Sequence, residues 1–278
     1  MKILGRTNLE FPDVWLQLGV PNLPEDIPAF VEAAVASGLP LEVASQPGLW
    51  GGYLRGHTPF LVATGSLNYT TGSDTSHASD LVQSELIHLL SSLGRETIDA
   101  YFLPVRESAE EVQVNGALEA LEAARHEGHI RFVGLQAVGH PLSALGLWQF
   151  HDGFELIRYR RNHVYTEAHE TLEPMAAERR VGIVTDGPFA WRVGQDFLTF
   201  PEDANVGAPM TDRQRMRNLI QGKTGRSLRE LVVCDLATEN PVLFPVRSLA
   251  DIRAASAVAI GKPIDGLSAY LAPFLEAA

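Results

Sequence analysis

Lysine is the scarcest charged residue in this chain of 278 residues, which contains only Lys2, Lys223 and Lys262. No ammonium side chain is therefore available between residues 3 and 222, and chemistry that needs a lysine in that part of the chain is excluded. Cysteine is scarcer still, since Cys234 is the only one. A single cysteine excludes an internal disulfide framework and favours a cytoplasmic location.

Long apolar runs and basic clusters are also missing. No run of roughly 18 or more apolar residues occurs, so the sequence predicts no transmembrane helix. The amino-terminal residues 1–6 lack the apolar core of a secretory signal. The net charge of −12 and the pI near 5.2 disfavour binding to a phosphate backbone. We expect a soluble protein that binds neither nucleic acid nor membrane.

What the sequence does contain is a repeated alternation of short apolar runs and longer helical patterns. The apolar runs predict strands at residues 14–18, 41–44, 60–64, 98–103, 131–135, 154–158, 181–185 and 242–244. Apolar residues at helical spacing predict helices at 27–35, 81–93, 108–127, 142–150, 170–179, 227–238 and 249–258. Two of these helices carry capping-box patterns at their starts, Ser108 with Glu111 and Ser227 with Glu230.

This alternation favours an α/β fold, a closed (β/α)8 TIM barrel that spans residues 1–278 as one domain. Several strands are apolar on both faces, as expected when helices cover a parallel sheet. An open doubly wound sheet is the alternative. It is weakened because no G-x-G-x-x-G pattern follows the first strand.

Three segments resemble the aldo-keto reductases. KILGRTNLE at residues 2–10 is similar to the hairpin that plugs the bottom of the barrel in that family. LLSSLGRETIDAY at residues 89–101 and ALEALEAARHEGHIRFVGL at residues 117–135 are similar to its passages into the fourth and fifth strands. The resemblance implies an N-terminal β-hairpin plug. It also implies that the second helix is abbreviated, because the segment between residues 44 and 60 is short for the family.

The resemblance further implies carbonyl reduction with NADP(H) by an Asp, Tyr, Lys and His. The lysine and aspartate would lower the pKa of the tyrosine, which is near 10 in the free side chain, and the histidine would polarise the carbonyl. In this chain the lysine position falls on Gly65 and the histidine position on Pro104. The aspartate position falls on Glu42 or Val43. The standard tetrad is therefore not present.

The remaining candidates for catalysis are Glu42, Tyr53 and Asp186. Tyr53 is the phenol nearest to the expected tyrosine position, where Trp50-Gly51 stands instead of a Tyr-Gly pair. Asp186 closes the seventh strand and would face the barrel mouth, although a turn residue that bonds its own backbone is the simpler interpretation.

The cofactor candidates follow from the resemblance alone. Gln136 stands where the family grips the nicotinamide amide, and Tyr159 where a tyrosine would stack on the ring. Arg247 and Ser248 stand in the loop that would bind the adenosine phosphate. An aromatic at the barrel rim and a solvated surface arginine are the simpler interpretations of Tyr159 and Arg247. No His or Cys spacing supports a metal site.

The segment Arg158-Tyr159-Arg160-Arg161 is the densest group of basic residues. It could hold an anion or pair with some of the many carboxylates of the chain, and we favour the second.

Three functions follow from these residues. The first is a non-reducing barrel that binds a small molecule at its C-terminal mouth, or a protein partner. The second is an active NADPH-dependent oxidoreductase that uses non-standard residues, for example Tyr53 with Glu42. The third is a lyase or isomerase with Glu42 and Asp186 as acid and base.

Overall fold

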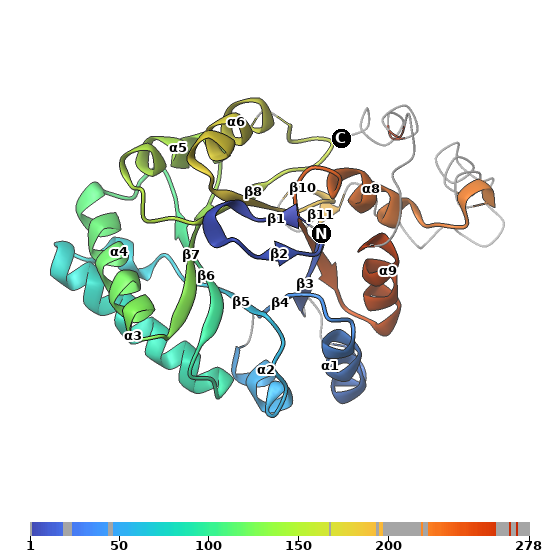
Figure 1. The fold of residues 1–278 in the computed structure, drawn as a ribbon, viewed down its shortest axis with the longest axis horizontal. Helices are drawn as coiled ribbons and strands as arrows, with labels where there is room; N and C mark the ends of the chain where they lie inside the picture. The colour runs from blue at the N-terminus through green and yellow to red at the C-terminus, as the bar shows by residue number, and fades with distance from the viewer. Residues whose placement is uncertain are drawn as a thin grey trace.

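The chain folds into a closed parallel barrel, which confirms the predicted (β/α)8 architecture (Figure 1). The computed structural model describes residues 2–18, 24–43, 47–166, 168–192, 195–196, 218, 222–259, 267 and 271. The barrel order is β12-β3-β4-β5-β6-β7-β8-β9. Its strands are β3 (Val14–Leu18), β4 (Leu41–Glu42), β5 (Leu61–Thr64), β6 (Ile98–Val105), β7 (Ile130–Ala137), β8 (Leu156–Arg160), β9 (Gly182–Asp186) and β12 (Val242–Val246).

Helices surround the barrel between successive strands (Figure 1). They are α1 (Ile27–Ala36), α2 (Pro47–Leu54), α3 (Thr75–Leu93), α4 (Glu111–His126), α5 (Pro141–Phe150), α6 (His169–Arg179), α8 (Leu228–Leu236) and α9 (Leu249–Ala259). Short 3-10 turns, η1 (Gly5–Thr7) and η2 (Asn68–Thr71), and a small pair, β10 (Ala190–Arg192) and β11 (Gln195–Asp196), complete the elements. The second helix is abbreviated as expected, with eight residues. Residue 44, the end of the second predicted strand, lies outside the described residues.

Alternate residues of each strand face opposite sides of the barrel wall, which explains why the strands are apolar on both faces. The inward positions form one core cluster with members from six strands, Trp15, Val62, Ala100, Phe102, Leu156, Val184 and Leu243. The positions between them belong to a second, larger cluster beneath the helices. Each strand is therefore buried from within and from without.

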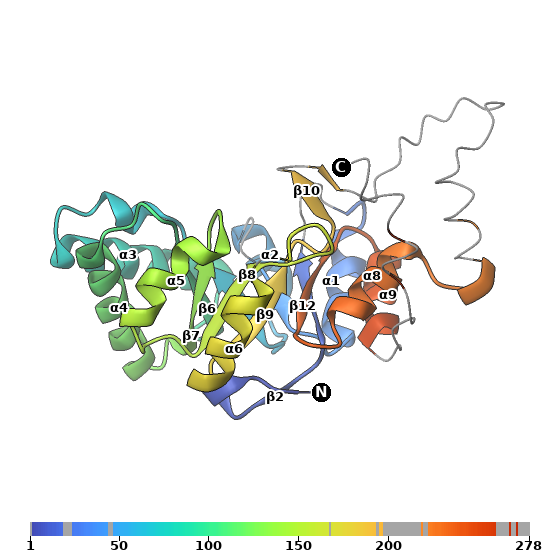
Figure 2. The same cartoon turned by 90° about the horizontal axis from the view of Figure 1, so that it is seen from above.

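The N-terminal hairpin closes one end of the barrel. It consists of β1 (Lys2–Ile3) and β2 (Glu10–Phe11), and Figure 2 shows it across the end opposite β10. Leu4 and Phe11 of the hairpin segment join the inward cluster, where the Phe11 ring centroid lies 5.4 Å from that of Trp15. This end of the barrel is sealed by apolar side chains.

The two predicted helix caps have different outcomes. Ser227 caps α8 with Glu230 in the predicted capping box. The prediction for Ser108 is wrong, because α4 begins at Glu111, where the Gln113 side chain accepts a 3.0 Å bond from the Glu110 backbone N–H. The Gln113 amide also donates to the Thr70 carbonyl at 2.8 Å, so a tertiary contact fixes this helix start.

The seating of the hairpin predicts a large effect of Gly5→Ala. Gly5 has φ +54°, and a Cβ at this position would lie 2.2 Å from the Gly182 backbone nitrogen. We expect urea unfolding to show a loss of at least about 2 kcal/mol, because backbone strain and a backbone clash add. Gly38→Ala is the matched control, since Gly38 has φ +68° but no atom within 4 Å of its Cβ position. Equal losses for the two variants would show that the hairpin is not seated against β9.

Candidate functional site at the barrel mouth

Beyond the inward apolar cluster, each strand has an inward residue near the C-terminal end of the barrel. These eight residues form the mouth ring, Gln17, Glu42, Thr64, Pro104, Gln136, Arg158, Asp186 and Pro245. Strand register supports the ring: Gln17 pairs with Glu42 and Pro245, and Gln136 pairs with Pro104 and Arg158. The C-terminal end is where barrel proteins carry their sites.

Arg158 of β8 is the centre of the mouth ring. Its Nη1 donates to Glu42 Oε1 at 3.0 Å and to Thr64 Oγ1 at 3.0 Å, and its Nε donates to Asp186 Oδ2 at 2.8 Å. Thr64 in turn donates to Glu42 Oε1 at 3.2 Å. Since β8 is four strands away from β4 in the barrel order, the arginine side chain spans the mouth from one wall to the other.

These charges are almost entirely removed from water. The side chains of Arg158, Glu42 and Asp186 are 4%, 2% and 15% exposed. Burial by itself lowers the pKa of Arg158, but the adjacent Glu42 and Asp186 carboxylates outweigh that effect and raise the pKa above its ordinary value. Two carboxylates against one guanidinium give the trio a formal charge of −1.

The structure answers two questions that the sequence left open. Glu42, and not Val43, faces the mouth, because Val43 belongs to the outer cluster beneath the helices. Arg158 pairs with carboxylates, as we favoured for the basic segment, and Arg161 likewise contacts Glu173 at 3.0 Å. The structure also brings Asp186 to Glu42 through their shared guanidinium.

The position assigned to the lysine needs correction. Gly65 faces outward, and a Cβ built on it would lie 2.1 Å from the hydroxyl oxygen of Tyr101. The inward residue at the end of β5 is Thr64. Pro104, assigned to the histidine, does face inward in the mouth ring.

Two tyrosines chosen from the sequence lie away from the mouth. Tyr53 is in the last turn of α2, outside the barrel wall, and is 39% exposed. Tyr159 faces outward beneath α6, where its hydroxyl donates to Glu173 Oε1 at 3.0 Å. Burial, followed by the charge of Glu173, raises the pKa of Tyr159. The mouth ring thus contains neither of these phenols. At the end of β8 the inward residue is Arg158 and not Tyr159.

Arg247 and Ser248 lie outside the mouth ring, at the start of α9. They line a cavity of about 490 Å³ together with Glu25, Asp26 and Phe30. Asp251 occupies the start of this helix: its Oδ2 accepts from the Arg247 backbone N–H and from the Ser248 hydroxyl, both at 2.9 Å. Of the four cofactor candidates, only Gln136 belongs to the mouth ring.

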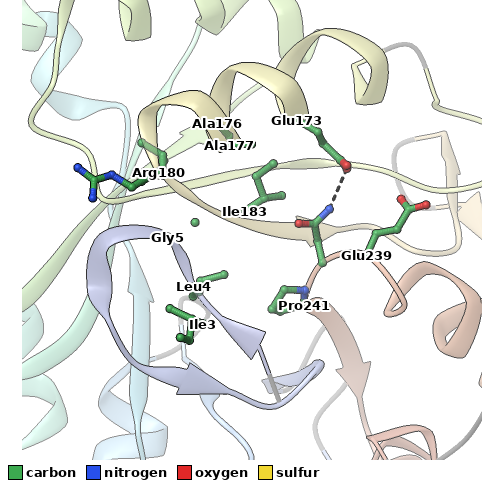
Figure 3. A pocket seen from close by; sticks show the side chains of 13 residues that line it. Ile3, Leu4, Gly5, Glu173, Ala176, Ala177, Arg180, Ile183, Glu239 and Pro241 are labelled. Carbon is green, nitrogen blue, oxygen red and sulfur yellow. Dashed lines mark hydrogen bonds between the residues drawn. The ribbon is translucent and has the colours of Figure 1, made fainter.

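A second cavity, of about 370 Å³, lies beside the hairpin at the closed end of the barrel (Figure 3). Ile3, Leu4 and Gly5 form one side, and Glu173 on α6 and Asn240 before β12 supply polar groups. Asn240 donates to Glu173 Oε1 at 2.8 Å. Because the same oxygen also accepts from Tyr159 and Arg161, this carboxylate already serves the packing of α6 against the barrel.

Comparison with known proteins bears on the fold. No protein-family model and no curated protein sequence matches this chain. An aldo-keto reductase from Bacillus halodurans matches in its holo form with a TM-score of 0.69 and 17% identity, over 100% of this chain and 96% of the other. MGS-M4, an aldo-keto reductase enzyme from a deep-sea metagenome library, matches with a TM-score of 0.73 and 13% identity, over 98% and 94%. Aldose reductase from Giardia lamblia matches with a TM-score of 0.70 and 13% identity, over 96% and 93%. The fold is that of the aldo-keto reductases.

Two further observations concern the described residues alone. They contain no group of three or more His, Cys, Asp or Glu side chains placed to hold a metal ion. None of the helices formed by these residues is both long and apolar enough to cross a membrane.

Arg158 and Thr64 are the site residues that sequence reasoning missed. The available signal was the spacing of two residues that separates Arg158 from Leu156 and Thr64 from Val62, which are both inward. Their partners were not visible, since Arg158 lies 116 residues from Glu42 in sequence.

The burial of this ion pair predicts a strong effect of Arg158→Met. Removal of the guanidinium leaves the Glu42 and Asp186 carboxylates buried without a counter-charge, and we expect a loss of about 3–5 kcal/mol in urea unfolding. Arg131→Met is the control, because Arg131 pairs with Asp99 at the surface and should cost about 1 kcal/mol or less. Similar losses for both variants would mean that the mouth charges are solvated.

Proposed function

We propose that this protein is a non-reducing barrel of the aldo-keto reductase fold that binds a small molecule at its C-terminal mouth. One observation carries the proposal: the eight residues of the mouth ring include no tyrosine, histidine or lysine. The cation in the ring is Arg158, whose Nε and Nη1 are already bonded to Glu42, Asp186 and Thr64. The polar groups of the ring, which are buried or half-buried, suit a small molecule better than a protein partner.

Carbonyl reduction needs a proton donor whose pKa is lowered towards neutrality. Three buried tyrosines near the strands have the opposite property. Burial raises the pKa of Tyr69, Tyr101 and Tyr159. The Tyr69 hydroxyl also donates to the Pro104 carbonyl at 2.9 Å, so its proton is engaged. None of these phenols suits proton donation at neutral pH.

The alternative function is an active NADPH-dependent oxidoreductase with non-standard residues. NADP(H) is supported only by resemblance, and the charges near Arg247 disfavour it. Glu25 and Asp26 line the same cavity as Arg247, and Asp251 already caps the start of α9. A phosphate placed there would meet three carboxylates and one guanidinium. The pairing of Tyr53 with Glu42 is also disfavoured, because Tyr53 lies outside the barrel wall.

An aldehyde assay tests the proposal directly. We expect wild-type protein to oxidise no NADPH above the protein-free rate with 4-nitrobenzaldehyde, because the mouth ring contains no tyrosine, histidine or lysine to transfer a proton to the nascent alkoxide. Far-ultraviolet circular dichroism of the same sample verifies that the protein is folded. Turnover that disappears in Glu42→Gln would establish the oxidoreductase alternative.

A cofactor titration separates the two functions at the binding step. The chain has four tryptophans, so a dinucleotide in the mouth should quench its intrinsic fluorescence. We expect no saturable quenching by NADPH in the micromolar range, because carboxylates surround the phosphate position. Micromolar saturation would favour the oxidoreductase and reject this electrostatic argument.

A further inference from the structure

The mouth ring retains hydrogen-bonding atoms that the protein itself does not use. Within the described residues, Arg158 bonds through Nε and Nη1, Glu42 through Oε1 and Asp186 through Oδ2. Arg158 Nη2, Glu42 Oε2 and Asp186 Oδ1 form no such bond. None of these three atoms is among the fully enclosed unpaired polar atoms of the described residues, so each retains a small accessible surface.

Two amide side chains flank these atoms. Gln136 of β7 is in register with Arg158, and Gln17 of β3 is in register with Glu42. Both are half-buried in the mouth ring. An amide supplies a donor and an acceptor from one side chain. The mouth therefore presents both donors and acceptors.

The presence of both donors and acceptors selects the chemistry of the ligand. A hydroxyl group is the uncharged group that both donates to a carboxylate and accepts from a guanidinium through one atom. A carbonyl oxygen satisfies only the N–H donors, and an ammonium satisfies only the oxygen acceptors. Since the trio has a formal charge of −1, an anionic ligand is disfavoured as well.

We propose that the ligand of the mouth ring is an uncharged polyhydroxylated molecule that presents neighbouring hydroxyls to Arg158, Glu42 and Asp186. This inference rests on the proposed small-molecule function of the same site. The ligand hydroxyls would bond to Arg158 Nη2, Glu42 Oε2 and Asp186 Oδ1, which the ion pair leaves unused. Gln17 and Gln136 would be additional hydrogen-bond partners.

Three cyclitols that differ mainly in charge test the proposal. myo-Inositol is uncharged, quinate has a carboxylate, and scyllo-inosamine has an ammonium group. Isothermal titration calorimetry is preferable to thermal shift, because polyols stabilise proteins non-specifically by exclusion. We expect myo-inositol to bind wild-type protein at least about fivefold more tightly than quinate or scyllo-inosamine.

Asp186→Asn tests the charge argument within the site. The substitution retains the size of the side chain and brings the formal charge of the trio from −1 to zero. We expect the affinity for quinate relative to myo-inositol to rise by about threefold or more. Glu127→Gln is the control, since Glu127 is 66% exposed at the end of α4 and should leave the ratio unchanged.

Four results would overturn the proposal. Tightest binding of quinate would make Arg158 an anion site, and tightest binding of scyllo-inosamine would make the carboxylates a cation site. Binding of no cyclitol up to about 100 mM would reject a polyol site. An equal change in the quinate to myo-inositol affinity ratio in Asp186→Asn and Glu127→Gln would place binding outside the mouth. These cyclitols contain no aldehyde or ketone group, so these outcomes are independent of the aldehyde assay that tests the proposed function.

Discussion

The buried contact of Arg158 with Glu42 and Asp186 is the constraint on which the barrel mouth depends. A guanidinium that is 4% exposed is stable only if carboxylates and hydroxyls satisfy its N–H groups, and β4, β5 and β9 supply them. Of these strands, β9 is the neighbour of β8, whereas β4 and β5 lie across the barrel from it. One side chain therefore ties opposite walls together at the end that the hairpin does not close.

The two ends of the barrel differ because the inward positions of the strands are apolar near the hairpin and mostly polar or charged at the mouth. Towards the hairpin, inward positions are apolar and pack with Leu4 and Phe11. Two residues further along β8, the inward position changes from Leu156 to Arg158. The apolar layer excludes water from below, so the electrostatic interactions of the mouth ring act in a low-dielectric environment. The hairpin thus contributes to the site without contacting it.

Most strands and helices could be predicted from the sequence, because several strands are apolar on both faces and helices such as α3 and α4 have a regular apolar face. The helix α2, which lacks such a face, was not among the helices predicted from apolar spacing. The site could be predicted only in part. The placement of Glu42 and Asp186 at the mouth could be predicted because carboxylates end apolar strands, whereas Gly65 and Tyr159 were misplaced by one residue relative to Thr64 and Arg158. A shift of one residue reverses the face of the barrel wall to which a side chain belongs. The partners of Arg158 come close to it only when the barrel closes, so no local sequence pattern could predict them.

The same geometry explains why a mouth that contains the buried Arg158 has no lysine at the end of β5. Arg158 Nη1 ends at Thr64, the inward residue of β5, so the guanidinium occupies the space into which a longer side chain at residue 64 would extend. Two cations could not share Glu42 there without mutual repulsion. An arginine also holds its charge at all ordinary pH values, and it cannot exchange a proton with a neighbouring phenol as an ammonium can. A mouth organised by arginine is therefore suited to fixed hydrogen-bond recognition, and a mouth organised by lysine is suited to proton transfer.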